Sequence, residues 1–251
     1  MPKPNFYDND PRYDYTKYWK GRDYENAAEE MAINALLKGR HFNSAADIGG
    51  GYGRLCKLLQ HYAKKVSLIE PSKKQRSLGE KFLKDTGVSI LDGTSTKTGV
   101  ADKGVDLITM IRVMHHLPDP QETFSELHRT LSDDGMIVLE VANSLNFKSR
   151  LRRLLKLKRT PLDPVDIKTD STTDVDLETP FVNHHPKKVK RQLREAGFTV
   201  VATRSASNFR MPGLKKIIPM SALLVLEKPC QSLLAPISFG PSMFYLLKKS
   251  N

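Results

Sequence analysis

Asp47-Ile-Gly-Gly-Gly-Tyr-Gly53 is a glycine-rich stretch between two apolar segments. The segment before it, residues 45–48, predicts a short strand, and apolar positions at helical spacing over residues 55–62 predict a helix. Glycines at a strand–helix turn allow a tight bend and let a ligand approach the backbone closely. The glycines do not follow the Gly-x-Gly-x-x-Gly spacing, which argues against a dinucleotide pyrophosphate and for a ligand without phosphate.

Predicted strands and helices alternate outward from this turn. Further strands are expected over residues 66–70, 88–91, 105–111 and 136–141, the last after a turn at 133–135, and later over 198–203 and 244–248. Helices are expected over residues 26–38, 72–85, 120–131 and 187–196, and over most of 214–235 with breaks at Pro219 and Pro229. This alternation predicts an α/β fold with a doubly wound, mostly parallel seven-stranded sheet that helices cover on both faces.

Length and composition limit the class of protein. The chain has 251 residues, of which 39% are hydrophobic and 27% charged, so it is not a wholly disordered chain. No apolar run approaches the ~18 residues that a membrane-spanning helix needs, and the first residues lack the features of a secretion signal. Cys56 and Cys230 lie far apart, so we expect no metal site, no disulfide framework and a cytoplasmic location.

Carboxylate side chains follow the next two predicted strands. Glu70 ends the strand over 66–70, 23 residues after Asp47, and a carboxylate there can accept hydrogen bonds from both ribose hydroxyls of an adenosine. Asp92 follows the strand over 88–91, where a carboxylate can bind an adenine amino group. The carboxyl ends of parallel strands meet at one edge of a sheet, so these groups are expected to line one ligand site.

These motifs are joined by Arg112-Val-Met-His-His-Leu-Pro-Asp-Pro120 after the fourth predicted strand. Together they resemble those of the class I S-adenosylmethionine (SAM)-dependent methyltransferases of the small-molecule type, close to methyltransferase domain families 11 and 25. The resemblance is strong over residues 30–142 and looser over 181–251. It implies a Rossmann-like methyltransferase fold with a helical insertion after strand five, and SAM as the cofactor.

The resemblance also implies a role for individual positions. The glycine turn would pass beneath the methionine part of SAM, Asp47 would contact its amino group, Glu70 would bind ribose, and Asp92 would face adenine. Residues 111–116 would line the site near the methyl sulfonium. The cofactor-binding residues implied in this way are Asp47, Gly49, Gly50, Gly51, Glu70, Pro71, Asp92, Gly93, Arg112 and Arg22.

Arg22 belongs to an N-terminal arm that is rich in Tyr, Asp and Trp. In related enzymes such an arm often closes over SAM, and an arginine there can pair with the methionine carboxylate through two hydrogen bonds. The alternative is that Tyr18 and Trp19 simply pack the arm on the core.

His115 and His116 follow the fourth predicted strand at the ligand-binding edge. Either imidazole could be a catalytic general base that deprotonates a hydroxyl or an amine. The alternative is that they orient the loop, since methyl transfer from a sulfonium often needs only positioning of the reactants. His184 and His185 precede a predicted helix, where they could contact substrate or merely start that helix.

The net charge of +12 is concentrated in a few segments. Residues 148–159 hold seven cations and no acid, and the apolar residues at positions 147, 151, 154 and 155 share one helical face. Residues 163–178 are acidic, and 187–194 are basic again. The segment 147–159 is interpreted as a lid that admits an anionic or lipid-like molecule or contacts a membrane surface. The alternative is a solvated helix whose apolar face packs on the domain.

We expect one methyltransferase domain over residues 1–251. Its parts are the N-terminal arm and helix (1–40), the SAM-binding core (41–142), the lid-like insertion (143–180) and the C-terminal part of the sheet (181–251).

The expected function is methyl transfer from SAM to a small molecule by direct in-line attack on the methyl group. One alternative is an RNA methyltransferase that binds phosphates through 148–159 and 187–194. Another is a non-catalytic SAM-fold binding module. Neither the acceptor nor an oligomeric state follows from the sequence.

Overall fold

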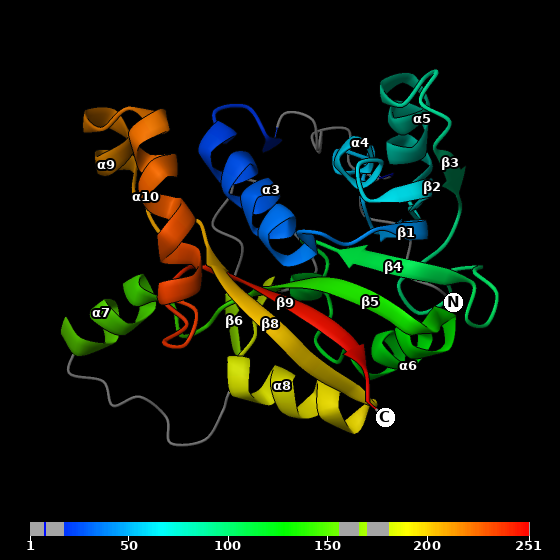
Figure 1. Ribbon diagram of the computed structural model, residues 1–251. Helices are drawn as coiled ribbons and strands as arrows, with labels where there is room; N and C mark the ends of the chain where they lie inside the picture. The colour runs from blue at the N-terminus through cyan, green and yellow to red at the C-terminus, as the bar shows by residue number, and fades with distance from the viewer. Residues whose placement is uncertain (1–7, 9–17, 156–165, 170–180, 251) are drawn as a thin grey trace.

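A seven-stranded sheet organises the computed structural model, which describes residue 8 and residues 18–155, 166–169 and 181–250. In spatial order its strands are β3 (Ser89–Leu91), β2 (Ala63–Ile69), β1 (Phe42–Ile48), β4 (Val105–Met110), β5 (Leu131–Ala142), β9 (Ser242–Lys249) and β8 (Phe198–Ala206). The first five are parallel, and β9 is antiparallel to both of its neighbours. The expected α/β fold with a doubly wound seven-stranded sheet is confirmed (Figure 1).

Helices cover both faces of this sheet (Figure 1). One face carries α3 (Asp23–Leu37), the short α4 (Cys56–Leu59) and α10 (Met220–Leu233), which follows α9 (Pro212–Ile217). The other face carries α6 (Gln121–Thr130) and α8 (Pro186–Glu195). Near the β2–β3 edge lies α5 (Lys73–Phe82), whose Gly79 approaches Leu68 and Ile90 of these strands.

Alternating side chains of the central strands build a core on each face. In β4, Leu107 packs with residues of α3 and Ile108 with residues of α6 and α8. In β5, Val138 faces the α3 side and Ile137 faces the side of α6 and α8. All four side chains are fully buried. Successive strand residues point to opposite faces, so a strand covered on both sides has to be apolar throughout. This is why the central strands were evident as continuous apolar runs.

The helix expected over residues 55–62 is wrong in length. The structure has only the single turn α4 there, with hydrogen-bonded turns on either side. Phe42 N of β1 already donates to the carbonyl oxygen of Tyr62 at 2.7 Å. The chain already pairs with β1 at residues 62 and 63, so the helix cannot extend over residues 60–62.

Two expected interruptions also lie inside regular elements. The turn expected at 133–135 is part of β5, because Leu131 already pairs with Val105 and the register shifts just beyond that pair. Pro229 lies inside α10 and does not end it. The carbonyl that its missing N–H would have bonded belongs to Val225, which is exposed, so water can replace the lost bond.

The insertion expected over residues 143–180 is described in part. It contains α7 (Phe147–Leu155) and β6 (Ile167–Thr169), which pairs antiparallel with β7 (Phe181–Asn183) just after the insertion. β7 packs against the short 3-10 helix η1 (Met114–His116), which follows β4. The end of the expected basic helix, most of the acidic run 163–178 and most of the N-terminal arm lie outside the described residues.

Two features are absent from the described part of the chain. None of its helices is both long and apolar enough to cross a membrane. Among the same residues, no group of three or more His, Cys, Asp or Glu side chains could hold a metal ion.

Candidate functional site

The residues that the sequence analysis selected gather at the carboxyl edge of the parallel strands. Asp47 of β1 is in register with Thr109 of β4 and Leu68 of β2. Glu70 follows β2 directly, and Arg112 follows β4 after one intervening residue. Since the parallel strands end at one edge, the structure brings these side chains to one side of the sheet, as expected.

Asp47 is a buried carboxyl group with one unsatisfied oxygen. Its Oδ1 accepts a hydrogen bond from the Thr109 hydroxyl at 2.7 Å, whereas its Oδ2 is buried with no hydrogen-bond partner among the described residues. Burial raises the pKa of Asp47 to about 6. A buried oxygen without a donor is costly, so this atom is a site for a donating group on a ligand, such as an ammonium.

Two glycines leave room for this carboxyl group and for the loop after β4. A Cβ atom at Gly50 would lie 2.2 Å from Asp47 Oδ2. A Cβ atom at Gly49, whose φ is +67°, would lie 2.5 Å from Val113 Cγ2. The glycine-rich turn is therefore demanded by local packing as well as by any ligand that approaches it.

Glu70 links the glycine turn to the start of α5. Gly51 N donates to its Oε2 and Ser72 N to its Oε1, each at 2.9 Å. Burial raises the pKa of Glu70 to about 7. Each carboxylate oxygen has two lone pairs, so each can accept one further hydrogen bond, for example from a ribose hydroxyl.

Asp92 is exposed and forms an ion pair with Arg76. Arg76 Nη1 donates to Asp92 Oδ1 at 2.8 Å and to the carbonyl oxygens of Glu70 and Pro71 at 2.8 and 2.9 Å. Arg76, which the sequence analysis did not select, therefore fixes the ends of β2 and β3 beside each other. The predicted ribose and adenine residues are thereby held on adjacent loops.

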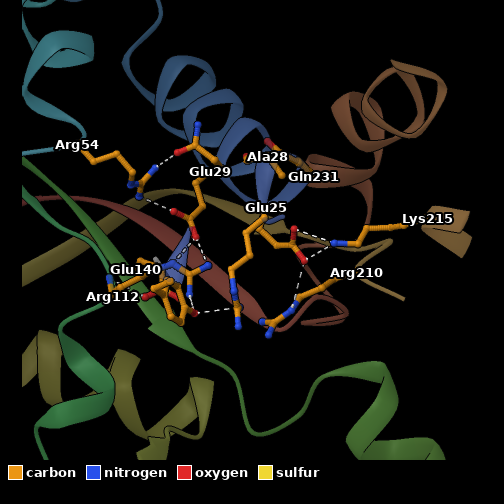
Figure 2. A network of polar contacts seen from close by, with 12 residues as sticks. Glu25, Ala28, Glu29, Arg54, Arg112, Glu140, Arg210, Lys215 and Gln231 are labelled. Carbon is orange, nitrogen blue, oxygen red and sulfur yellow. Dashed lines mark hydrogen bonds and ion pairs between the residues drawn. The ribbon is translucent and has the colours of Figure 1, made fainter. Parts of the chain in front are cut away.

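Arg112 is held by the fully buried carboxylate of Glu29 in α3. Its Nε donates to Glu29 Oε1 at 2.6 Å, and its Nη2 forms an ion pair with the same oxygen. Arg54 Nη2, from the segment after the glycine turn, pairs with Glu29 Oε2 at 2.7 Å (Figure 2). The backbone N–H of Arg112 donates to Glu140 Oε2 at 3.1 Å. One carboxylate thus binds two guanidinium groups from different loops.

Arg22 and Arg112 converge on the phenol oxygen of Tyr18. Their Nη1 atoms donate to it at 3.1 and 2.7 Å, and the Arg22 guanidinium lies 4.0 Å from the ring centroid. Arg54 lies 3.9 Å from the ring centroid of Trp19. The two aromatic residues therefore pack against three arginines, of which Arg54 and Arg112 are also paired with Glu29.

His115 and His116 lie on η1, beside the two-stranded sheet of β6 and β7. The His115 ring stacks on Phe181 of β7 at a centroid distance of 4.3 Å and lies 4.0 Å from the His116 ring. Burial lowers the pKa of His116 to about 4 and that of His115 well below its usual value. Both imidazoles are therefore neutral near pH 7 and able to accept a proton, although a low pKa makes them weak bases.

His184 and His185 have structural partners. His184 is fully buried, and its Nε2 lies 2.8 Å from the carbonyl oxygen of Met114 in η1. His185 precedes α8, and its Nδ1 accepts a hydrogen bond from Lys187 N at 3.2 Å. Of the two interpretations in the sequence analysis, the structure favours the start of the helix for His185.

The chain is similar in sequence to known methyltransferases. Residues 46–139 match the model of a methyltransferase domain family. The chain is 29% identical over 137 residues to an uncharacterized methyltransferase of Oceanobacillus iheyensis, covering 53% of this chain and 63% of that protein. It is 25% identical over 124 residues to an uncharacterized methyltransferase of Bacillus subtilis, covering 47% and 49%. The matches thus span less than two thirds of the length of these relatives.

Solved structures show the same fold. A chain in the complex between the Haloferax volcanii Trm112 methyltransferase activator and the putative methyltransferase has a TM-score of 0.64 at 14% identity, with 94% of both chains covered. An S-adenosylmethionine dependent methyltransferase from Mesorhizobium loti has a TM-score of 0.63 at 16% identity, covering 90% of this chain and 100% of that one. The match over residues 46–139 and the shared fold support a class I SAM-dependent methyltransferase domain.

Several polar residues that hold the fold together were not predicted from the sequence. Asp8 of the N-terminal arm accepts hydrogen bonds at the start of α5 from the Ser72 hydroxyl at 2.6 Å and from Lys74 N at 2.9 Å. Burial alone would raise the pKa of Asp8, but these hydrogen bonds lower it. No local pattern marks Asp8, because its partners are distant in sequence.

Glu25 and Glu29 were also missed, although the sequence contains a signal for them. Both lie on the same buried helical face as Ala28 and Ala32. A carboxylate on the apolar face of a helix requires a cationic or hydrogen-bonding partner. Glu25 is paired in this way with Lys215 of α9 at 3.0 Å (Figure 2).

Replacing Glu29 by Gln is expected to lower the free energy of unfolding of the methyltransferase domain by about 3 kcal/mol, because two enclosed guanidinium groups lose the carboxylate that neutralises them. Urea denaturation followed by circular dichroism measures the change. Glu80→Gln, which removes an exposed carboxylate of α5, is the control and is expected to change it by less than about 0.5 kcal/mol. Equal small changes in the two variants would contradict a stabilising role for Glu29.

Proposed function

We propose that this protein transfers the methyl group of SAM to a small acceptor molecule. The observation that carries the proposal is the unsatisfied, buried Oδ2 of Asp47 beside the glycine turn. An amino-acid ammonium would supply the donor that this oxygen lacks, and the hydroxyls of a ribose would donate to Glu70. The family match makes SAM the implied cofactor.

The remaining cofactor-binding roles follow from their positions. Asp92 would accept from the adenine amino group on the loop that Arg76 fixes. Gly93 keeps that loop close to the chain, since a Cβ there would lie 2.7 Å from the carbonyl oxygen of Thr98. Arg22 and Arg112, which converge on Tyr18, would attract the methionine carboxylate.

Bound SAM supplies a methyl group on a positively charged sulfur. The chain contributes orientation, because transfer requires the attacking atom, the methyl carbon and the sulfur to lie in line. His115 and His116 are the candidates for a general base where the acceptor is a hydroxyl or an amine, since both imidazoles are neutral near pH 7.

A small acceptor is supported by the position of β7, which pairs with β6 of the insertion. β7 packs on η1, and Phe181 stacks on His115, so this strand forms a wall beside the candidate base. RNA is the second candidate acceptor, because α8 exposes four cations: Lys187, Lys190, Arg191 and Arg194. A gel shift at low salt distinguishes the two, since RNA bound through phosphates is released steeply as salt is raised. Release of S-adenosylhomocysteine with an acceptor pool distinguishes an enzyme from a non-catalytic SAM-binding module.

Glu70→Ala is expected to weaken the binding of S-adenosylhomocysteine by about tenfold or more, because hydrogen bonds to a carboxylate are among the stronger ones in proteins. Isothermal titration calorimetry measures the affinity. Glu80→Ala, which removes an exposed carboxylate of the neighbouring helix α5, is the matched control and should bind as the natural chain does. An unchanged affinity in Glu70→Ala would refute the assignment of Glu70 to the cofactor.

The affinity for S-adenosylhomocysteine is expected to fall as the pH is lowered from 8 to 6. The pKa of Glu70 is raised to about 7 and that of Asp47 to about 6, so protons compete with the ligand's donors in this window. The two protonations together predict a decrease of about tenfold or more. Glu70→Gln removes one of the titrating groups and should flatten the profile. A profile that is equally steep in this variant would contradict the proposal.

Replacing His115 and His116 together by Ala is expected to reduce turnover by about 100-fold or more if they supply the base, with an unchanged affinity for S-adenosylhomocysteine. Turnover is measured as release of S-adenosylhomocysteine from SAM in a pool of hydroxyl and amine acceptors. His61→Ala, at an exposed position, serves as the control. Full turnover in the double variant would exclude the base role and leave only loop positioning.

A further inference from the structure

An apolar stripe on α7 is left uncovered by the part of the chain that the structure describes. Phe147 and Leu151 are 44% and 42% exposed, and Leu154 and Leu155 are 71% and 75% exposed. None of the nine residues of this helix, all of which the structure describes, is buried. The four apolar side chains are spaced so that they share one helical face. The interpretation that this face packs on the domain is therefore wrong for Leu154 and Leu155.

Cations border this stripe on both sides. At about 100° per residue, Lys148 and Arg152 fall on one side of the apolar residues, and Arg150 and Arg153 fall on the other. Residues 147–155 contain no acid. The sequence continues with Lys156, Lys158 and Arg159, which lie outside the described residues. An apolar stripe between rows of Lys and Arg is the pattern of a helix that lies in the interface of an anionic bilayer.

The first turn of α7 is fixed to the body of the protein. The Phe147 ring stacks on that of Phe239 at a centroid distance of 4.9 Å, and Phe147 N donates to the Phe239 carbonyl oxygen at 2.8 Å. Arg150 Nη2 donates to the carbonyl oxygen of Ile237 at 2.5 Å. The rest of the helix extends away from the sheet (Figure 1). Ile237, which is 51% exposed, adds apolar surface near the fixed end.

From this arrangement we propose that α7 binds the surface of an anionic lipid bilayer. The leucines enter the boundary of the acyl chains, and the flanking arginines and lysine contact the anionic headgroups. Two other partners satisfy only part of the arrangement. A symmetric dimer through α7 would place four cations against four cations, and RNA would contact the cations without burying Leu154 and Leu155. The inference concerns α7 and does not depend on the proposed methyl transfer.

Co-sedimentation of the full chain with vesicles tests the proposal. Vesicles of pure phosphatidylcholine are compared with vesicles of phosphatidylcholine mixed with phosphatidylglycerol. Arg152→Glu with Arg153→Glu reverses two charges on α7. The control, Lys64→Glu with Lys65→Glu, makes the same change in net charge at two exposed positions of β2. Circular dichroism and S-adenosylhomocysteine binding confirm that each variant is folded.

The natural chain is expected to sediment with the mixed vesicles and not with the neutral ones. The α7 charge reversal should weaken this binding by about tenfold or more, and the β2 control should change it little. Equal losses of vesicle binding in both variants would show that the net charge of +12, and not α7, attracts the protein to the vesicles. This result would overturn the proposal.

Leu154→Ser with Leu155→Ser tests insertion separately from charge. It should also weaken vesicle binding by about tenfold or more, because both side chains leave water on binding. Unchanged binding would overturn the role of the apolar stripe. No sedimentation of the natural chain would overturn the proposal as a whole. A dimer that the leucine variant dissociates would then assign the stripe to a second copy of the chain.

Discussion

The carboxylate of Glu29 joins three parts of the chain that are far apart in sequence. It belongs to α3, and its partners Arg54 and Arg112 come from the segment after the glycine turn and from the loop after β4. The group is fully buried, so its charge has to be matched by these guanidinium groups. Arg112 adopts a φ of +60°, which is strained for a residue with a side chain. The ion pair with Glu29 and the bond from its backbone N–H to Glu140 hold it in that conformation.

The two sides of the candidate site differ in charge. On one side, Asp47 and Glu70 have raised pKa values because they are buried, and they are suited to donors such as an ammonium or hydroxyls. On the other side, Arg22 and Arg112 gather around Tyr18 and are suited to an anion. A zwitterionic amino-acid group matches this separation of charge. The proposed position of the methionine part of SAM therefore has an electrostatic basis in addition to the family match.

The predictable parts of this structure are those that depend on local sequence patterns. The central strands are apolar on both faces because helices cover both faces, and the glycine turn is marked by its composition. Glu70 and Asp92 could be placed because the ends of parallel strands meet at one edge.

The parts that could not be predicted depend on contacts between distant segments. Arg54 was not selected from the sequence and Arg112 was assigned to the cofactor, and only the fold brings both to Glu29. Pairing with β1 shortens the helix expected over 55–62. The turn expected at 133–135 lies inside β5, where the register of its pairing with β4 shifts. The amphipathic pattern of α7 was evident, but whether its apolar face is covered depends on the position of the whole helix.

The side chain of Asn143 connects the segment after β5 with the segment before β9. Its Nδ2 donates to the carbonyl oxygens of Ser238 and Gly240 at 2.7 Å each, and Phe147 stacks on Phe239 close by. The segment after β5 and the segment before β9 are therefore held together by these contacts. A change of length in either one would have to be matched in the other. In evolution these two segments would therefore diverge together, while the loops at the other end of the sheet, around β1, β2 and β3, would be free to change independently.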